Sequence, residues 1–325
     1  MKKLGITMGD PAGVGPEIIM KALGDGTVFE GKYVVYGAID ILKFYNDLLK
    51  LNCEFHEIQS PEEYKEGMIN VIDPNHLTMD QYEIGKLSAK CGDAAYQYIA
   101  RAIEDAKKGE IDAVVTAPLN KEALHMGGHN YDGHTEIFAT LTGTEKYAMM
   151  FYGPLKIMHV STHCSLREAC DRATKQRVLD CIELMDKALK QTGMANPLIA
   201  VAGLNPHAGE HGLFGMEEIE EIIPAIEAAK EEGINVTGPI PPDSVFNKTL
   251  NGVYDAAIAM YHDQGHIAAK LQLMSECVNC TIGLPIIRTS VDHGTAFDIA
   301  GKGIASGDNM KQSMWVAEEF LNNKQ

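Results

Sequence analysis

The sequence is poor in positive charge and has no long apolar run. It holds 28 Lys and Arg residues against 45 Asp and Glu, which gives a formal net charge of −17. Such an acidic chain repels phosphate backbones and anionic lipid, so neither nucleic acid nor a charged membrane surface is an expected partner. No stretch of the sequence approaches the roughly 18–20 apolar residues that span a bilayer. We therefore expect no membrane association.

Cysteines are few and irregularly spaced. Seven of them, an odd number, are scattered over 325 residues, a pattern typical of reduced thiols in the cytoplasm and not of a disulfide framework. The start of the chain, MKKLGITMGD, reaches glycine and aspartate too early for the apolar region of a signal peptide. The lone Cys277-Val-Asn-Cys280 motif is interpreted as two half-buried thiols, since no second CxxC completes a zinc site.

The common phosphate-binding fingerprints are also missing. There is no G-x-x-x-x-G-K-[ST] motif, and the early segment GITMGDPAGVGPE does not fit G-x-G-x-x-G. A P-loop and an ordinary Rossmann cofactor site are therefore not expected. The same early segment still has the pattern of a strand, a glycine loop and a helix, with Pro16 in the helix's first turn.

Short apolar runs alternate with helical patterns along the chain. Examples are KYVVYGAID before ILKFYNDLLKL, and DAAIAMYHD before QGHIAAKL. This alternation predicts an α/β fold with a largely parallel sheet and helices on both faces. The segment YAMMFYGPLKIMHVSTH has two apolar runs joined at Gly153-Pro154, which predicts a hairpin and hence a mixed sheet. Ligands of such sheets bind at the carboxyl ends of the strands.

Three histidines lie shortly after apolar runs. His163 ends IMHVSTH, His207 ends LIAVAGLNPH and His262 ends AAIAMYH. Three strands would thus deliver one imidazole each to the same sheet edge, and three imidazoles with an open fourth position form a recurrent catalytic metal site. Nitrogen ligands favour zinc, cobalt or another transition ion over magnesium. The alternative is that these are unrelated surface or helix-capping histidines.

Two carboxylates and two basic residues stand out near these segments. Asp263 directly follows His262, and Asp243 lies in the loop PPDSVF; each can accept a proton or orient a ligand, or simply form a turn or cap a helix. Lys270 and Arg288 are the only Lys or Arg residues between Lys248 and Lys302.

Arg288 follows the apolar segment IGLPII, where a guanidinium would be poorly solvated unless it met an anion. Its planar fork suits a phosphate or carboxylate, while an internal salt bridge is the alternative. The segment GHTE, Gly133 to Glu136, precedes a helical pattern whose N-terminus can also attract an anion.

Several longer motifs carry a family resemblance. They are MGDPAGVGPE, TAPLNKEAL, GHTE, STH, GLNPHAGE, AMYHDQG and GLPIIRTSVDHGTAFDIAG. Through them the chain resembles the 4-hydroxythreonine-4-phosphate dehydrogenase family over essentially its whole length. The residues of the segments TAPLNKEALHMGGHNYDGHTE and HVSTHCSLREA resemble the D-threonate and D-erythronate 4-phosphate dehydrogenase branch more closely than the vitamin B6 enzymes. Its terminal loops, GDPAGVGPE and HGTAFDIAGKGIA, also look like loops of isopropylmalate and isocitrate dehydrogenases, whose relatives bind NAD without the Rossmann fingerprint.

The resemblance implies a fold and an assembly. The expected fold is a two-domain α/β fold like that of isocitrate and isopropylmalate dehydrogenases, with mixed, mostly parallel sheets, helices on both faces and a central cleft. Residues 1–127 and 283–325 would form a cofactor-side domain from both chain ends. Residues 128–282 would carry the metal ligands and the contacts of a homodimer whose active site lies at the interface.

The resemblance also implies site residues. The metal ligands would be His163, His207 and His262. Asp263 and Asp243, singled out above from the sequence itself, are the candidate catalytic bases. The substrate-binding residues would be His134, Thr135, Lys270, Asn279 and Arg288. The cofactor-binding residues would be Gly13, His293, Gly294, Thr295 and Asp298. One segment departs from the family: Glu276, Cys277 and Cys280 stand where relatives are usually glycine-rich and apolar, which changes the expected rim of the substrate site.

The implied activity is an NAD- and divalent-metal-dependent oxidation followed by decarboxylation. The oxidised group would be the 3-hydroxyl of 4-hydroxythreonine 4-phosphate, D-threonate 4-phosphate or D-erythronate 4-phosphate. The metal could be zinc, cobalt, manganese or magnesium, with zinc favoured by the ligand type. One alternative is a cis-dihydrodiol carboxylate dehydrogenase of aromatic degradation. Another is a relative that binds ligands without turning them over.

Overall fold

The computed structural model describes residues 2–273 and 277–323. The chain divides into two compact units, the first formed by Met1–Glu145 with Leu284–Leu321 and the second by Lys146–Gly283 with Asn322–Gln325. Both chain ends thus contribute to folded structure far from them in sequence. Helix α5 (His134–Thr142) belongs to the first unit in this division, whereas the sequence-based division after residue 127 assigns it to the second domain.

The first unit contains six parallel strands. Their order in the sheet is β3-β4-β2-β1-β5-β12, and every neighbouring pair runs parallel. All four residues of β4 and of β5 are buried, as expected for strands covered on both sides. The strands are β1 (Lys3–Thr7), β2 (Lys32–Tyr36), β3 (Phe55–Glu57), β4 (Ile69–Ile72), β5 (Ala113–Thr116) and β12 (Ile287–Ser290).

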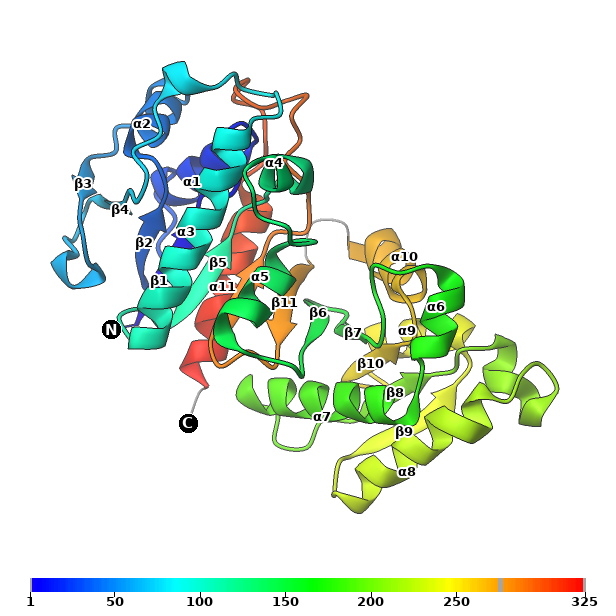
Figure 1. Cartoon of the computed structure of the whole chain (residues 1–325). Coiled ribbons are helices and arrows are strands. Elements are labelled where there is room, and N and C mark those ends of the chain that lie inside the picture. Colours follow the sequence, from blue (N-terminus) through cyan, green and yellow to red (C-terminus); the bar gives the residue numbers. More distant parts are fainter. Residues whose placement is uncertain (1, 274–276, 324–325) are drawn as a thin grey trace. The chain divides into compact units, whose positions relative to one another are not determined.

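Local sequence signals set the helices of the first unit (Figure 1). Helix α3 begins where the Ser88 side chain accepts a hydrogen bond from the Cys91 amide, and it ends at Gly109, which adopts a left-handed conformation. Pro16 lies in the first turn of α1, as predicted. The helices are α1 (Gly15–Gly24), α2 (Ile39–Leu48), η1 (Pro61–Glu63), η2 (Met79–Gln81), α3 (Ala89–Lys108), α4 (Lys121–Met126), α5 and α11 (Asp308–Asn322).

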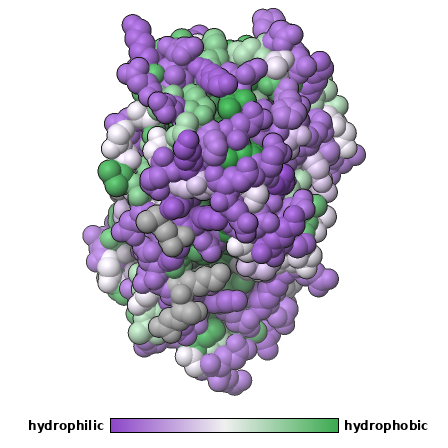
Figure 2. All heavy atoms as spheres, turned by 90° about the vertical axis from the view of Figure 1, so that its left-hand side faces the viewer, coloured by the Kyte–Doolittle hydropathy of each residue, from purple (hydrophilic) through white to green (hydrophobic). Residues whose placement is uncertain are grey.

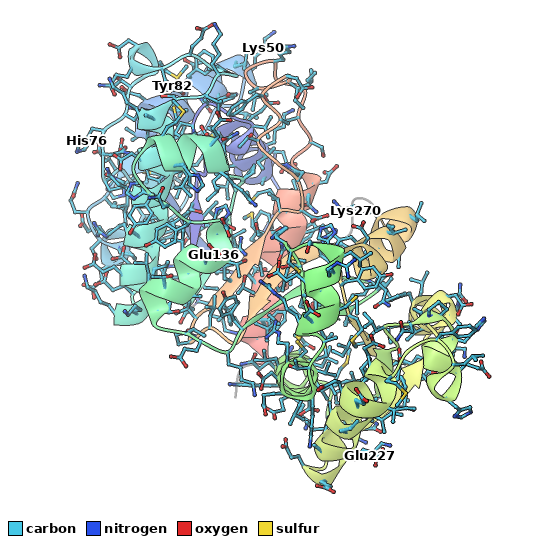
Figure 3. The ribbon with its side chains drawn as sticks, turned by 45° about the vertical axis from the view of Figure 1, so that its right-hand side comes forward. Lys50, His76, Tyr82, Glu136, Glu227 and Lys270 are labelled. Carbon is cyan, nitrogen blue, oxygen red and sulfur yellow. The ribbon has the colours of Figure 1, made fainter. Side chains whose placement is uncertain are left out.

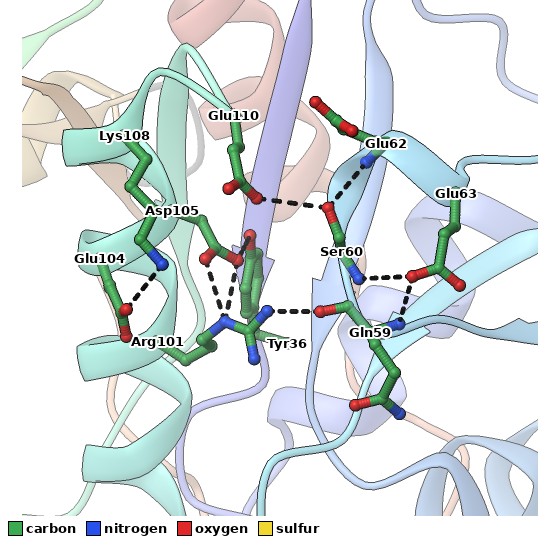
Figure 4. A network of polar contacts seen from close by, with 10 residues as sticks. All are labelled: Tyr36, Gln59, Ser60, Glu62, Glu63, Arg101, Glu104, Asp105, Lys108 and Glu110. Atoms are coloured by element: carbon green, nitrogen blue, oxygen red, sulfur yellow. Dashed lines mark hydrogen bonds and ion pairs between the residues drawn. The ribbon is translucent and has the colours of Figure 1, made fainter.

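A buried carboxylate fastens α3 to the sheet (Figure 4). Asp105 accepts hydrogen bonds from the Tyr36 hydroxyl at 2.8 Å and from Arg101 Nε at 3.0 Å. The Arg101 guanidinium also donates to the Gln59 carbonyl. Asp105 is fully buried, so the pairing with Arg101 and Tyr36 offsets the desolvation of its charge. This contact fixes the long helix against β2 and the turn that begins with Ser60.

The second unit contains a mixed sheet, as the sequence predicts. The strand order is β11-β6-β7-β10-β8-β9, in which β6 runs antiparallel to both of its neighbours and the other pairs are parallel. The hairpin expected at Gly153-Pro154 is the β6–β7 pair. The strands are β6 (Ala148–Tyr152), β7 (Ile157–His159), β8 (Ile199–Ala202), β9 (Val236–Ile240), β10 (Ala256–Ala259) and β11 (Val278–Ile282).

Amphipathic helices cover this second sheet. Helix α7 begins at the cap residue Thr174, and its residues Val178, Ile182, Met185 and Leu189 are buried. Their spacing of three to four residues gives one apolar face that packs inward. The helices are α6 (Leu166–Arg172), α7 (Lys175–Gln191), η3 (Pro206–Gly212), η4 (Glu218–Ile222), α8 (Ile223–Glu231), α9 (Pro242–Leu250) and α10 (His262–Leu273).

The surface and the cysteines agree with the composition. Hydrophilic side chains predominate on the face shown in Figure 2, with hydrophobic ones scattered between them. Within residues 2–273 and 277–323, no helix is long and apolar enough to cross a membrane. All seven cysteines are free thiols, and Cys277 and Cys280 are both buried where we expected them half-buried. Glu276, the third residue of that predicted rim, lies outside the described residues.

Candidate active site

The three candidate metal ligands follow three neighbouring strands. Strands β7, β10 and β8 are adjacent and parallel, so their carboxyl ends meet at one edge of the sheet. His163 lies just beyond β7, His262 beyond β10 and His207 beyond β8. The common edge that we expected from the sequence is therefore present within the second unit. The assignment of these residues as metal ligands remains a prediction.

Buried hydrogen bonds tie the three histidine-bearing loops together. Gln264 accepts a hydrogen bond from the Met260 amide at 2.7 Å and donates to the Gly203 carbonyl at 2.9 Å. The Ser161 hydroxyl donates to the Met260 carbonyl at 2.9 Å. Because Ser161, Met260 and Gly203 belong to the loops of His163, His262 and His207 respectively, this network fixes the spacing of the loops. Sequence reasoning missed Gln264, although the AMYHDQG motif contains it.

His163 and His262 lie close enough for one metal ion. Their ring centres are 5.8 Å apart, and rings that share one zinc ion at Zn–N distances of ~2.0–2.1 Å have centres roughly 5 Å apart. His262 Nδ1 lies 2.7 Å from Asp263 Oδ1, an arrangement that leaves Nε2 for a metal and orients the ring. The donor chemistry of this pair therefore fits a divalent transition metal.

His207 belongs to a left-handed turn. Four residues other than glycine have positive φ there: 54° at His207, 55° at Ala208, 42° at Glu210 and 56° at His211. This conformation is unfavourable by ~1–2 kcal/mol for each such residue, so surrounding contacts must hold it. Among the described residues, no three His, Cys, Asp or Glu side chains are placed to hold one ion. The three histidines therefore do not form a three-ligand group within the described part of one chain.

Two further histidines pack behind His262. The His266 ring stacks on His262 with centres 3.5 Å apart, and His159 lies 4.7 Å from His266. Burial is the main cause that lowers the pKa of His159 to about 3 and of His266 to about 4, with neighbouring histidines adding to it. Both rings are therefore neutral at physiological pH. Their packing behind His262 fits a supporting role for these two rings.

The two candidate bases line one cavity of the second unit. Its volume is about 410 Å³. Its lining is mainly apolar, with polar groups from Asp243, Asn247, Tyr261, Asp263 and Gln264. The predicted loop position of Asp243 is wrong, because the residue lies in the first turn of α9. The preceding Pro-Pro pair begins a helix here, since proline's fixed φ suits a first turn. Asp263 occupies the corresponding first turn of α10.

A buried guanidinium and an imidazole mark the predicted substrate region of the first unit. Arg288 is 3% exposed, and its Nη2 donates to Thr116 Oγ1 at 2.8 Å while the guanidinium lies 5.6 Å from the Phe138 ring centre. Burial and the nearby Arg288 charge hold the pKa of His134 well below its usual range. His134 Nε2 is buried without a hydrogen-bond partner. A neutral imidazole beside a cation can bind an anionic oxygen ligand.

The other predicted substrate residues lie on three elements. Thr135 is in the first turn of α5, ahead of the Glu136 labelled in Figure 3. In the second unit, Lys270 lies on α10 (Figure 3) and Asn279 on β11. Asn279 Oδ1 is buried without a hydrogen-bond partner, which leaves an acceptor for a ligand. The roles of these residues stay predictions.

The two predicted cofactor loops touch each other within the first unit. The Val14 amide donates to the Thr295 carbonyl at 2.9 Å, and a Cβ added at Gly13 would meet Thr295 Cβ and O at 2.8 Å. Only glycine allows this close approach. Gly294 has open space around it, and His293 Nδ1 lies 3.0 Å from the Gly294 carbonyl. Asp298 lies further along the same loop.

Sequence reasoning missed the residues that fasten the end of this loop. Glu17 is fully buried and accepts hydrogen bonds from the amides of Ala305 at 2.7 Å and Gly303 at 3.2 Å. Lys21, one turn further along α1, pairs with Glu17 at 3.1 Å and donates to the carbonyls of Gly303 and Ala305. The i,i+4 spacing of Glu17 and Lys21 is the signal that sequence offered.

Asp10, in the glycine loop, gives a pH-dependent prediction. Burial raises the pKa of this carboxyl to about 6 although the Ala12 amide donates to it at 2.9 Å, and its Oδ2 is buried without a hydrogen-bond partner. The folded chain therefore binds this proton more tightly than the unfolded chain, whose pKa is about 3.9. Stability is lost as pH rises between these values. The loss is complete above pH ~6 and amounts to about 3 kcal/mol.

Replacing Asp10 with Asn removes the buried charge and keeps the acceptor for the Ala12 amide. We expect the free energy of unfolding at pH 8 to rise by up to about 3 kcal/mol, and the gain to vanish near pH 4. Urea unfolding at several pH values measures it. Asp112→Asn is the control, because the Asp112 carboxylate also accepts a hydrogen bond from a backbone amide, that of Lys3, but is exposed to solvent. A gain that does not change with pH would contradict the assignment.

Comparison with known proteins gives consistent matches over the whole chain. The family profile described as pyridoxal phosphate biosynthetic protein PdxA matches residues 30–317. D-threonate 4-phosphate dehydrogenase of Salmonella typhimurium is 49% identical over 323 residues, covering 98% of this chain and 99% of that protein. The structure of 4-hydroxythreonine-4-phosphate dehydrogenase from Klebsiella pneumoniae is similar with a TM-score of 0.90 and 46% identity, covering 100% of this chain and 98% of that one.

A more distant solved structure also aligns. It is the terephthalate 1,2-cis-dihydrodiol dehydrogenase of Burkholderia xenovorans, with a TM-score of 0.70 and 28% identity over 98% of both chains. The comparisons confirm the resemblance drawn from the motifs. They also confirm the predicted fold class, a two-domain α/β fold of the isocitrate and isopropylmalate dehydrogenase type.

Proposed function

The chain belongs to the PdxA family, and on that premise we propose that it is an NAD- and divalent-metal-dependent dehydrogenase of a four-carbon acid 4-phosphate. It oxidises the 3-hydroxyl, and the resulting β-keto acid loses carbon dioxide. The observation that carries the proposal is the 49% identity with D-threonate 4-phosphate dehydrogenase over almost the full length of both chains. D-Threonate 4-phosphate is therefore the first candidate substrate, ahead of D-erythronate 4-phosphate and 4-hydroxythreonine 4-phosphate.

In the proposed function, substrate anions are bound by a few positive and polar groups of an acidic chain. Arg288 binds a phosphate or carboxylate through two parallel N–H···O bonds. Neutral His134 and the Thr135 hydroxyl bind neighbouring oxygens, and Lys270 and Asn279 are the remaining contacts. The buried state of Arg288 supports its role, because a guanidinium held in place loses little entropy when it meets an anion.

His163, His207 and His262 would hold the metal, with zinc favoured by their nitrogen ligands. A bound divalent ion acts as a Lewis acid toward the substrate hydroxyl and the negative charge that develops when carbon dioxide leaves. Asp263 holds the His262 ring through Nδ1. Asp243, at the cavity shared with Asp263, is the candidate that accepts the hydroxyl proton, directly or through water.

We propose that two copies of the chain complete this site. The three histidines do not form a three-ligand group within the described part of one chain. The segment after His207 carries exposed apolar side chains: Leu213 is 71% exposed and Phe214 48%. Met216, Ile219 and Ile223 continue this apolar surface. Exposed apolar surface of this kind marks a protein interface. A homodimer with its active site at the interface accounts for both observations.

NAD would bind at the paired loops of Gly13 and Thr295, with His293, Gly294 and Asp298 beside them. The close backbone contact between these loops supports the assignment. We propose the unit formed by both chain ends as the cofactor-side domain, and the unit that carries the three histidines as the metal and dimer domain. The seven free thiols fit a reducing compartment, and we propose that the protein acts in the cytoplasm.

A substrate panel tests the proposed function. The purified chain is assayed with NAD and zinc, cobalt, manganese or magnesium on D-threonate, D-erythronate and 4-hydroxythreonine 4-phosphates. Reduced nicotinamide is followed by its absorbance, and NADP is the cofactor control. We expect the highest kcat/KM with D-threonate 4-phosphate and no turnover after chelation of the metal. Turnover of no four-carbon acid phosphate with any of these metals would contradict the proposal.

The second candidate function is oxidation of a cis-dihydrodiol carboxylate. The structural match to the terephthalate dihydrodiol dehydrogenase favours it, but at 28% identity this match is weaker than the matches to the phosphate enzymes. A higher kcat/KM with a phosphate-free dihydrodiol carboxylate than with every phosphate in the panel would favour this second function. A chain that binds substrate and NAD yet never reduces the cofactor would instead be a non-catalytic binding relative.

A further inference from the structure

A buried carboxylate holds the start of the loop that carries His207. Glu218, the first residue of η4, is 1% exposed. Its Oε1 accepts a hydrogen bond from the Asn205 amide at 2.7 Å, and its Oε2 accepts one from Asn205 Nδ2 at 3.0 Å. The same Asn205 Nδ2 donates to Glu217 Oε2 at 2.7 Å. The carboxylates of Glu217 and Glu218 therefore hold Asn205 through hydrogen bonds from both its backbone amide and its side chain.

Two glycines give the Glu218 carboxylate its space inside the loop. A Cβ added at Gly209 would lie 2.5 Å from Glu218 Oε2, and one added at Gly203 would lie 3.1 Å from Oε1. The carboxylate thus fills the interior of the turn between the end of β8 and the far side of the His207 loop. A buried side chain in this place supports the turn from within.

The turn that Glu218 fills is the one that needs support. His207 and the three residues Ala208, Glu210 and His211 have the left-handed backbone conformation described above. The Ala208 amide donates to the Asn205 carbonyl at 3.1 Å, so Asn205 begins the turn as well as contacting Glu218. Fixing Asn205 therefore fixes the backbone direction from which His207 projects.

We propose that Glu218 is a positioning residue for His207, and that it sets the affinity of the histidine site for a divalent transition metal. The inference rests on the proposed function, in which His207 is a metal ligand. Glu218 acts through Asn205 and contacts no substrate. Its carboxylate keeps the left-handed turn in the one conformation that presents the His207 ring to the ion.

Glu218→Gln tests the proposal with little change in size. Glutamine keeps one acceptor oxygen but places an NH2 group against the other Asn205 donor, so one of the two hydrogen bonds is lost and the clamp weakens. We expect the zinc affinity of the apoprotein, measured by calorimetry or a competing chelator, to fall about tenfold to a hundredfold. NAD affinity should not change, because the cofactor loops lie in the other unit. Glu220→Gln, at an exposed position of the same helix η4, is the matched control and should bind zinc as the wild type does.

Hydrogen exchange of the 203–215 segment provides a readout that does not depend on metal. Glu218→Gln and Asn205→Ala should both speed exchange in this segment while the strands of the unit stay protected. If Glu218→Gln fails to fold, Asn205→Ala takes its place in the test. This variant keeps the hydrogen bond from the backbone amide of residue 205 to Glu218 and loses only the one from the Asn205 side chain. Unchanged zinc affinity or unchanged exchange in the folded variants overturns the proposal. If the wild-type chain binds no metal, the proposed function is wrong. The hydrogen-exchange result then still shows whether Glu218 holds the turn.

Discussion

Replacing His207 with Ala is expected to remove metal binding and turnover together. A bound metal contributes several kcal/mol of charge stabilisation to the transition state, and each 1.36 kcal/mol corresponds to a factor of ten in rate. We therefore expect kcat/KM to fall by about a thousandfold or more. Metal content after dialysis, measured by mass spectrometry, should fall with it. A variant that keeps its metal and near-normal turnover would remove His207 from the site.

His211→Ala is the matched control for this experiment. His211 belongs to the same left-handed turn and is exposed, but the family resemblance does not make it a ligand. Its replacement changes the turn's composition without removing a proposed metal contact. We expect it to keep most of the zinc affinity and most of the turnover. Equal losses in both variants would indicate that the turn as a whole, and not the His207 imidazole, determines activity.

Mixing two inactive variants tests whether the site is shared between subunits. His207→Ala and His262→Ala chains are each expected to be inactive alone. If the two residues reach one metal from different subunits, a mixed dimer contains one site with all its ligands intact. Unfolding and refolding the two variants together should then restore part of the activity. No recovery, with mixed dimers shown to form, would mean that each chain supplies its own complete site.

The sequence was sufficient to place the three histidines at one sheet edge. Each follows a short apolar run, and parallel neighbouring strands put their carboxyl ends on the same side. Strands β7, β10 and β8 are such neighbours. The mixed sheet could also be predicted, because Gly153-Pro154 separates two apolar runs that are too close for a crossover. The periodicity of apolar residues and the turn residues carried these predictions.

Long-range packing produced what the sequence could not show. Nothing local to His207 predicts a left-handed turn, because the carboxylate that fills the turn comes from Glu218, beyond the loop. Asp10 reads as an ordinary loop aspartate, and only the surrounding fold buries it and raises its pKa. The sequence segment PPDSVF was interpreted as a loop around Asp243, yet its two prolines begin helix α9. The misses at His207 and Asp10 concern residues whose environment comes from elsewhere in the chain, whereas the miss at Asp243 concerns a local signal that has two interpretations.

Replacing Arg288 with Met is expected to raise the KM for the 4-phosphate substrate roughly a hundredfold or more. Hydrogen bonds to charged groups are worth ~1.5–3 kcal/mol each, and a guanidinium can make two to one anion. If these bonds are equally strong in the ground and transition states, kcat should change little while KM rises. Initial rates over a wide range of substrate concentration separate the two constants. Circular dichroism checks that the variant is folded.

Arg288→Lys is the matched variant, because it keeps the positive charge and loses the two parallel N–H donors of the guanidinium. A lysine can offer only a point charge in place of two parallel donors. The KM of Arg288→Lys should therefore lie between those of the wild type and Arg288→Met.

A comparison of two substrates identifies the anion that Arg288 binds. The four-carbon acid without its phosphate is assayed beside the same acid carrying the 4-phosphate. If Arg288 binds the phosphate, both variants should lose much of the preference for the phosphorylated substrate. If it binds the carboxylate, both substrates should weaken by the same factor and the preference should persist. Wild-type KM values in Arg288→Met would instead assign the buried guanidinium to the structure alone, through its contacts with Thr116 and Phe138.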